Sequence, residues 1–188
     1  MRNKLILASA SPRRASLLKQ IHITPDEISA ADIDESELKG EKPKDCAQRL
    51  ALQKAKAVHK PSHFTLGADT IVAVGTRMLP KTETPEQAQQ CLKMLSGRRH
   101  HVIGGIALIT PDNKEITRTV DTVVQFKQLT PTEINDYLES KEWQGIAGGY
   151  AIQGLAASFI KSLRGSYSNV VGLSLYDTMN MLKGNGFE

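Results

Sequence analysis

Cysteine is scarce in this chain of 188 residues, and long hydrophobic runs are missing. The two cysteines, Cys46 and Cys91, do not stand at a paired spacing, which favours a reducing compartment and a role as small apolar side chains. The apolar run near the N-terminus is too short for a signal peptide, and no stretch approaches the length of a membrane span. We therefore expect a cytoplasmic protein without a membrane partner.

Several nucleotide-binding and catalytic motifs are also missing. The chain has no GxxxxGK[ST] loop and no GxGxxG fingerprint. No serine or cysteine lies in a recognisable nucleophile elbow. His59 and His63 have a zinc-like spacing, but Pro61 between them breaks the helix that would align them. The sequence therefore argues against a zinc site and against a covalent nucleophile.

The charge balance is only mildly basic, with 24 Lys and Arg against 20 Asp and Glu and a formal net charge of +4. This balance suits an anionic small ligand, whereas a dedicated nucleic-acid binder would carry clustered basic tracts. A chain of this length can form one substantial core or two packed lobes, but not two independent domains. We expect one domain over residues 1–188, with no stable nucleic-acid partner.

Strand-like and helix-like segments alternate along the chain. Apolar runs and alternating patterns predict strands over residues 5–9, 66–74, 101–109, 118–126 and 159–163. Helical spacing and capping residues predict helices over 12–20 and 44–59, and three more that start at Thr84, Thr130 and Ser174. A hairpin turn at 111–113 coexists with helical crossovers, so we expect an α/β protein with a mixed sheet rather than a doubly wound parallel one.

A strand that runs directly into a basic helix start is the most informative segment. Leu5 to Ser9 is followed by Ser11 and Pro12, which suit the cap and the first position of a helix. Arg13 and Arg14 then place two cations in the first turn, where they oppose the helix dipole unless an anion is bound. Free amides, a hydroxyl and two guanidinium groups together predict a phosphate site.

Two ionisable residues fall in apolar surroundings. Asp69 lies in LGADTIVAV, which reads as a buried strand, so its carboxylate needs a cationic partner, a metal ion or a place facing a cleft. The alternative is a turn aspartate that caps a backbone amide after Gly67. Lys54 falls on the apolar face of its predicted helix, where it either snorkels to the rim or meets an anion. The functional interpretation of Asp69 is favoured because perturbed ionisable groups concentrate at active sites.

Three loop segments supply further candidates. Glu35 belongs to the acidic stretch DIDE, which either holds a divalent cation or is an exposed acidic loop. Lys81 follows the Asp69 strand on a loop and carries little information alone. The glycine-rich segment 147–154 permits close approach of a ligand to the backbone, and the Gln153 amide is able to read a base edge; a plain turn is the alternative.

Seven segments, taken in order, are similar to one known family. They are LASASPRR, DIDE before GEKP, RLALQKAKA, LGADTIVAV, AQQCLKMLSGRRHHV, GGYAIQG and GSYSNVVGLSL. The chain resembles the Maf family of nucleoside triphosphate pyrophosphatases, and GADT and AIQG resemble its dTTP/UTP branch. The resemblance implies an elongated α/β fold related to the inosine triphosphate pyrophosphatases. It also implies a mixed twisted sheet flanked by helices, two lobes with a cleft between them, and a homodimer.

The resemblance also implies roles for individual residues. Asp69 is expected to be the general base, and Glu35 is expected to join Asp69 in holding a divalent metal cation, Mg²⁺, Mn²⁺ or Co²⁺. The expected phosphate ligands are Ser9, Arg13, Arg14, Lys54 and Lys81. The positions associated with the choice of nucleotide are Arg13, Thr70 and Gln153.

These expectations combine into one mechanism for dTTP, UTP or modified nucleotides. A water activated by Asp69 attacks the anhydride between the α and β phosphates, and pyrophosphate leaves while cations neutralise its charge. A housecleaning role against non-canonical nucleotides would follow. The alternative is a regulator of cell division, a septum formation inhibitor, that binds nucleotides or nucleic acid without catalysis. Asp69 favours the enzyme, because binding alone does not require an acid inside an apolar strand.

Overall fold

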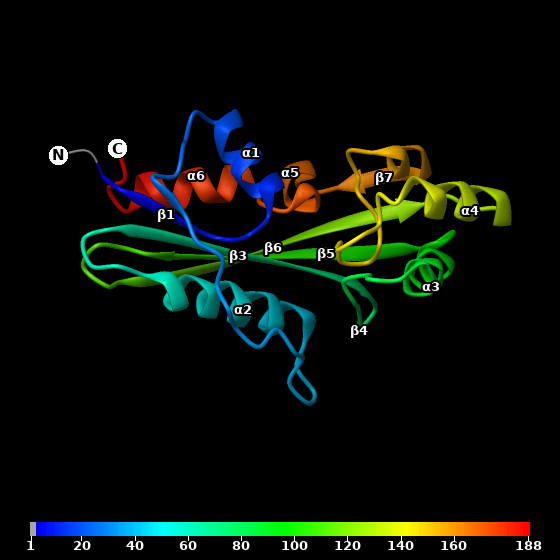
Figure 1. The fold of residues 1–188 in the computed structure, drawn as a ribbon, viewed down its shortest axis with the longest axis horizontal. Helices are drawn as coiled ribbons and strands as arrows, with labels where there is room; N and C mark the ends of the chain where they lie inside the picture. Colours follow the sequence, from blue (N-terminus) through cyan, green and yellow to red (C-terminus); the bar gives the residue numbers. More distant parts are fainter. Residues whose placement is uncertain (1–2) are drawn as a thin grey trace.

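The computed structural model describes residues 3–188, and in this part of the chain seven strands form one sheet (Figure 1). The strands are β1 Leu5–Ala8, β2 Glu27–Ile28, β3 Phe64–Val74, β4 Arg77–Leu79, β5 Arg99–Ile109, β6 Glu115–Phe126 and β7 Ile160–Arg164. Their order is β2-β1-β3-β5-β6-β7, and β4 pairs with the far end of β3. β1 is parallel to β2 and β3 while the other pairs are antiparallel, which confirms the predicted mixed sheet.

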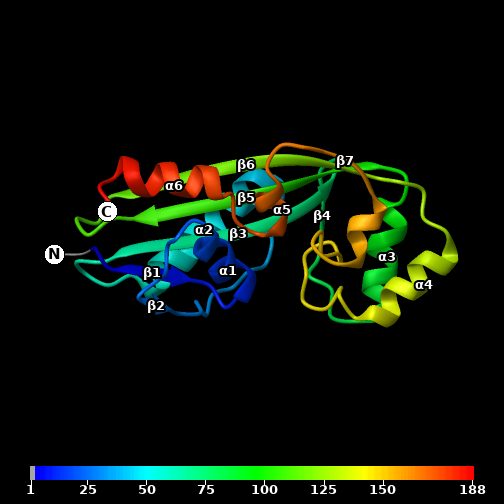
Figure 2. The same ribbon diagram turned by 90° about the horizontal axis from the view of Figure 1, so that it is seen from above.

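Helices cover both faces of this sheet. α2 Pro43–Val58 lies on one face, and α1 Pro12–Gln20, α5 Tyr167–Val171 and α6 Leu175–Gly184 lie on the other (Figure 1). α3 Pro85–Leu95, α4 Pro131–Ser140 and the 3₁₀-helix Leu155–Phe159 gather at the end of the sheet farthest from α6, so the outline is elongated as predicted (Figure 2). Over residues 3–188 no helix has the length and apolar character needed to cross a membrane.

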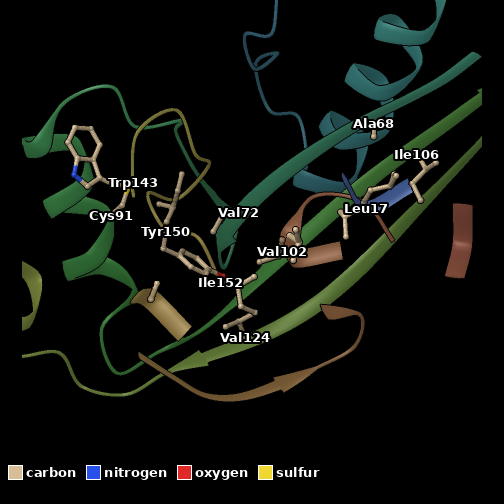
Figure 3. Close-up of a cluster of buried hydrophobic side chains, with 14 of the residues drawn as sticks. Leu17, Ala68, Val72, Cys91, Val102, Ile106, Val124, Trp143, Tyr150 and Ile152 are labelled. Atoms are coloured by element: carbon tan, nitrogen blue, oxygen red, sulfur yellow. The ribbon is translucent and has the colours of Figure 1, made fainter. Parts of the chain in front are cut away.

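One apolar cluster runs from the sheet into the end that carries α3 and α4 (Figure 3). Leu17 of α1 and Ile106 of β5 belong to it, together with Cys91 of α3 and the loop residues Trp143 and Tyr150. The two ends of the molecule therefore share buried apolar contacts. The organisation of residues 1–188 as one domain with two lobes stays a prediction, which this continuity favours.

The predicted helix starts are largely confirmed. Pro12 begins α1, but the expected cap is wrong, because the Ser11 side chain accepts no capping hydrogen bond. The Ser9 hydroxyl instead accepts a hydrogen bond from the Ser11 N–H at 3.1 Å. The helix start predicted at Thr130 is also confirmed, and a complete capping box forms there, with Thr130 and Glu133 each accepting a hydrogen bond from the other residue's backbone N–H.

Four short elements escaped the sequence prediction, namely β2, β4, the 3₁₀-helix and α5. α5 begins at Tyr167, and the Ser166 hydroxyl caps it by accepting the Asn169 N–H. Elements of two to five residues are too short to show the periodicity of a helix or a strand.

α2 lies directly on the sheet because two strand residues lack side chains. A Cβ atom at Gly67 of β3 would come 2.2 Å from the carbonyl oxygen of Ala51. One at Gly105 of β5 would come 2.0 Å from the carbonyl oxygen of Ala47. The close approach of both strands to the α2 backbone brings Lys54 within reach of the sheet.

Candidate active site

A cavity of about 430 Å³ lies beside β3, a size typical of small-molecule sites. Its walls come from the end of β1, the start of α1, the loop before α2, α2 itself, β3 and the glycine-rich loop. All nine residues singled out in the sequence line this cavity: Ser9, Arg13, Arg14, Glu35, Lys54, Asp69, Thr70, Lys81 and Gln153.

Asp69 and Lys54 form an ion pair inside the cavity wall. Asp69 lies in the middle of β3, opposite Gly105, and is only 3% exposed, so the alternative of a turn aspartate is wrong. The Lys54 ammonium donates to Asp69 Oδ1 at 2.5 Å. Of the two alternatives for Lys54, snorkelling to the rim is therefore wrong, and the side chain meets an anion.

Glu35 extends this pair into a chain of alternating charges. Its Oε1 lies 2.8 Å from the Lys54 ammonium, and its other carboxylate oxygen accepts a hydrogen bond from Lys81. Burial opposes ionisation of Glu35, but the two ammonium groups outweigh it and lower the pKa of this carboxyl to about 2. The order Asp69–Lys54–Glu35–Lys81 leaves each buried charge next to a charge of opposite sign.

The acidic stretch DIDE is not a cation site by itself. Over residues 3–188, no group of three or more His, Cys, Asp or Glu side chains is arranged to hold a metal ion. Glu35 alone of the stretch lines the cavity, while Asp34 turns back on the loop and accepts the N–H of Ser36 at 2.9 Å. The two carboxylates that do converge are Glu35 and Asp69, which both contact the Lys54 ammonium.

Arg14 is held by the protein on three sides. Its Nε donates to the Gly172 carbonyl at 2.9 Å, Nη1 to the Ser9 hydroxyl at 3.1 Å and Nη2 to the Thr70 hydroxyl at 3.2 Å. Burial lowers the pKa of this guanidinium, and the nearby Asp69 carboxylate partly offsets the effect. A guanidinium group has five N–H bonds, so one on each terminal nitrogen remains for a ligand in the cavity that Arg14 lines.

Arg13 and Gln153 line the same cavity from two separate elements. Arg13 lies in the first turn of α1 and is half-buried, and its pKa is lowered by burial, with Tyr137 acting in the opposite direction. Gln153 is exposed at the end of the glycine-rich loop. The structure thus brings residues 13 and 153, which are distant in sequence, to one site.

The sequence reasoning missed Tyr150 and the Gly172 carbonyl. Tyr150 lines the cavity, and its hydroxyl lies 2.8 Å from His100 Nε2. Burial raises the pKa of this phenol. The signal for Tyr150 was an aromatic residue inside a glycine-rich loop, whereas a backbone carbonyl leaves no signal in a sequence.

Solved structures offer a moderate likeness. The Ham1 protein of Staphylococcus aureus superposes with a TM-score of 0.45 at 17% identity, covering 66% of this chain and 72% of that chain. A HAM1 protein from Coxiella burnetii gives a TM-score of 0.45 at 17% identity, over 66% and 73% of the respective chains.

Sequence relatives are much closer. A protein of Caulobacter vibrioides named dTTP/UTP pyrophosphatase is 54% identical over 185 residues, covering 97% of this chain and 96% of that protein. A protein of the same name from Paramagnetospirillum magneticum is 56% identical over 185 residues, covering 97% of this chain and 97% of that protein. The family model described as Maf-like protein matches residues 4–185, nearly the whole chain. This protein therefore belongs to the Maf family.

Proposed function

We propose that this protein hydrolyses nucleoside triphosphates, dTTP and UTP in particular, to the nucleoside monophosphate and pyrophosphate. The buried Asp69–Lys54 pair on the cavity wall is the observation that carries the proposal. A site that only bound anions would need the cations but would not need a buried carboxylate, which costs free energy to desolvate. Relatives 54% and 56% identical to this chain carry the name dTTP/UTP pyrophosphatase, which supports the choice of substrate.

The triphosphate is bound by the cations of the cavity. Arg14 presents its two remaining terminal N–H bonds, a geometry suited to bidentate contact with phosphate oxygens. Arg13 adds a second guanidinium, and Lys81 supplies a mobile point charge. A charge-assisted hydrogen bond of this kind contributes about 1.5–3 kcal/mol.

The donor set fits a divalent metal cation that arrives with the nucleotide. Asp69 and Glu35 both contact the Lys54 ammonium, so their oxygens lie close enough together to face one cation. Mg²⁺ is commonly held by one or two carboxylates plus substrate phosphates, and Mn²⁺ accepts the same hard oxygen ligands. When bound, such an ion would offset phosphate charge and polarise the α phosphate.

In the proposed reaction Asp69 acts on the attacking water. Its carboxylate accepts a proton as the water oxygen bonds to the α phosphorus, and the bond from that phosphorus to the bridging oxygen breaks. The bridging oxygen keeps the electron pair and departs with pyrophosphate, whose charge is neutralised by Lys54, Lys81 and Arg14. A positioned base contributes about 10²- to 10⁴-fold to the rate, and preorganised charges commonly contribute more.

Recognition of the base is proposed for Arg13, Thr70 and Gln153. Uracil and thymine share an edge with an N–H donor between two carbonyl acceptors. The primary amide of Gln153 offers both an NH₂ donor group and a carbonyl acceptor, so it can pair with that edge in two places. Because the two bases differ only by a methyl group, the same contacts serve dTTP and UTP. The homodimer and the cytoplasmic location stay predictions.

The proposal is tested by Asp69→Asn. Pyrophosphate release from dTTP and UTP should disappear, while nucleotide binding measured by calorimetry should persist, because the cations remain. The matched control is Asp121→Asn, which changes an exposed carboxylate of β6 that pairs with His101, and it should keep wild-type turnover. Equal release by wild type and Asp69→Asn would refute the role of Asp69. Binding of a long oligonucleotide with steep salt dependence, without pyrophosphate release, would instead support the cell-division regulator.

A further inference from the structure

A single buried side chain, Asn169, ties α5 to the sheet. Asn169 has no exposed surface, and its amide nitrogen lies 3.0 Å from the carbonyl oxygen of Val102 and 3.2 Å from that of Val120. The same nitrogen lies 3.1 Å from the Thr122 hydroxyl. One amide therefore joins α5 to both β5 and β6.

The sheet is shaped to receive this side chain. A Cβ atom at Gly104 of β5 would come 2.0 Å from Asn169 Oδ1, so glycine leaves the space that the amide fills. The Thr122 hydroxyl also accepts the Ser166 N–H at 3.1 Å and donates to the Ser166 carbonyl at 3.3 Å. A helix of five residues is not stable alone, so these contacts determine where α5 lies.

The residue that ends α5 makes the contact with the cavity. Gly172 has φ +143°, and its N–H donates to the Ser168 carbonyl at 3.0 Å. Its own carbonyl accepts the hydrogen bond from Arg14 Nε. Any shift of α5 along the sheet would therefore move the acceptor that orients the Arg14 guanidinium.

We propose that Asn169 is a positioning residue for Arg14, acting through α5 and the Gly172 carbonyl. It lies 155 positions away in sequence from the arginine it orients. The inference rests on the proposed function, in which Arg14 binds the triphosphate. Because planar guanidinium groups bind phosphate through a fixed fork, their orientation matters as much as their charge. A displacement of about 1 Å at a reacting site can cost about 10²-fold in rate.

A double-mutant cycle tests the proposal. Pyrophosphate release from dTTP is measured for wild type, Asn169→Ala, Arg14→Lys and the double variant. Arg14→Lys keeps the charge but removes the fork, so it is expected to retain measurable activity. Asn169→Ala should lower kcat/KM by about 10²-fold in wild type and by less than about threefold in the Arg14→Lys background, because coupled residues are not additive.

Stability controls separate positioning from general damage. Leu92→Ala removes a fully buried side chain from α3, at the other end of the molecule, and should lower stability while its effect on kcat/KM multiplies with that of Arg14→Lys. Thr122→Val removes the hydroxyl that holds Asn169 and Ser166 while nearly keeping shape. If Asn169→Ala fails to fold, Thr122→Val takes its place in the double-mutant cycle with Arg14→Lys.

The outcomes are distinguishable. The fold-loss in kcat/KM caused by Asn169→Ala, or by Thr122→Val in its place, is compared in wild type and in Arg14→Lys. If this fold-loss is the same in both backgrounds, Asn169 is only structural and the inference is overturned. If Arg14→Lys itself has wild-type kcat/KM, the proposed phosphate-binding role of Arg14 fails, and the inference fails with it. If Asn169→Ala folds and its effect on kcat/KM largely disappears in the Arg14→Lys background, the result supports both the phosphate-binding role of Arg14 and the positioning role of Asn169.

Discussion

The Lys54 ammonium lies 2.5 Å from Asp69 Oδ1, and each of these side chains exposes less than a tenth of its surface. Burying two charges costs several kcal/mol per ion, which their attraction only partly offsets, so an apolar pair at these positions would hold the fold at least as well. The pair is therefore better explained by the chemistry of the cavity than by stability.

Removal of one partner should be costly. Lys54→Met keeps the length of the side chain but leaves Asp69 buried without its cation, and we expect the free energy of unfolding to fall by about 3–5 kcal/mol. Urea denaturation measures this loss. The double variant Lys54→Met with Asp69→Leu should recover most of it and remain inactive. A loss below about 1 kcal/mol for Lys54→Met would mean that the pair is solvated rather than buried.

Glu35 should make folding sensitive to acid. Its pKa is lowered in the folded protein to about 2, because Lys54 and Lys81 outweigh the effect of burial. A lowered pKa means that the folded state favours the ionised carboxylate. Its contribution to stability is thus present above about pH 4.5 and is lost as the pH falls through about 2.

The measurement compares the pH dependence of unfolding in wild type and Glu35→Gln. The difference between the two should be largest near neutral pH and should shrink toward pH 2. Glu41, whose pKa is also lowered to about 2 by Arg49, is present in both proteins and cancels from the difference. The Glu35 side chain is 36% exposed, so solvent screening keeps the effect modest. A difference that stays constant with pH would contradict the ion pairs.

Much of the fold could be predicted because its signals are local. β1 and α1 follow from an apolar run beside a Ser-Pro helix start, and α2 from helical spacing of Leu50 and Ala51. β2, β4 and α5 could not be predicted, since two to five residues form only when longer neighbours hold them. α5, for example, depends on Asn169 reaching strands 47 to 67 residues earlier in the chain.

The site was only partly visible in the sequence. Lys54 stood out because a cation on an apolar helix face demands an explanation, and Asp69 because of its apolar neighbours. The bridge of Glu35 between Lys54 and Lys81 left no such signal, because it joins segments that only the folded sheet brings together. The hydrogen bond from Arg14 to the Gly172 carbonyl could not be predicted either, because its acceptor is a backbone atom 158 positions away in sequence.

The contact between α2 and β5 should not tolerate a methyl group. In Gly105→Ala the new Cβ would meet the backbone carbonyl oxygen of Ala47 at 2.0 Å, and the two residues belong to a regular strand and a regular helix. Overpacking of this kind costs about 1–3 kcal/mol, and any outward shift of α2 would also displace Lys54. We expect lower stability and lower kcat/KM together. Gly184→Ala, which meets no atom within 4 Å, is the matched control and should cost nothing. Wild-type stability and activity for Gly105→Ala would show that α2 does not rest on β5 as described.

His100 should give a second, separate pH dependence. It is fully buried against Phe126 and Tyr150, and burial, with a smaller effect of His101, lowers its pKa to about 4. Between about pH 6.5 and 4, His100 is therefore protonated in the unfolded chain but neutral in the folded protein. The contribution of neutral His100 to the free energy of unfolding is complete above this range and is lost as the pH falls through it. His100→Gln should remove this slope. The constant offset from lost packing does not affect the comparison, and the other histidines are common to both proteins. An unchanged slope between pH 6.5 and 4 would mean that His100 is protonated in the folded state, with its Tyr150 contact rearranged.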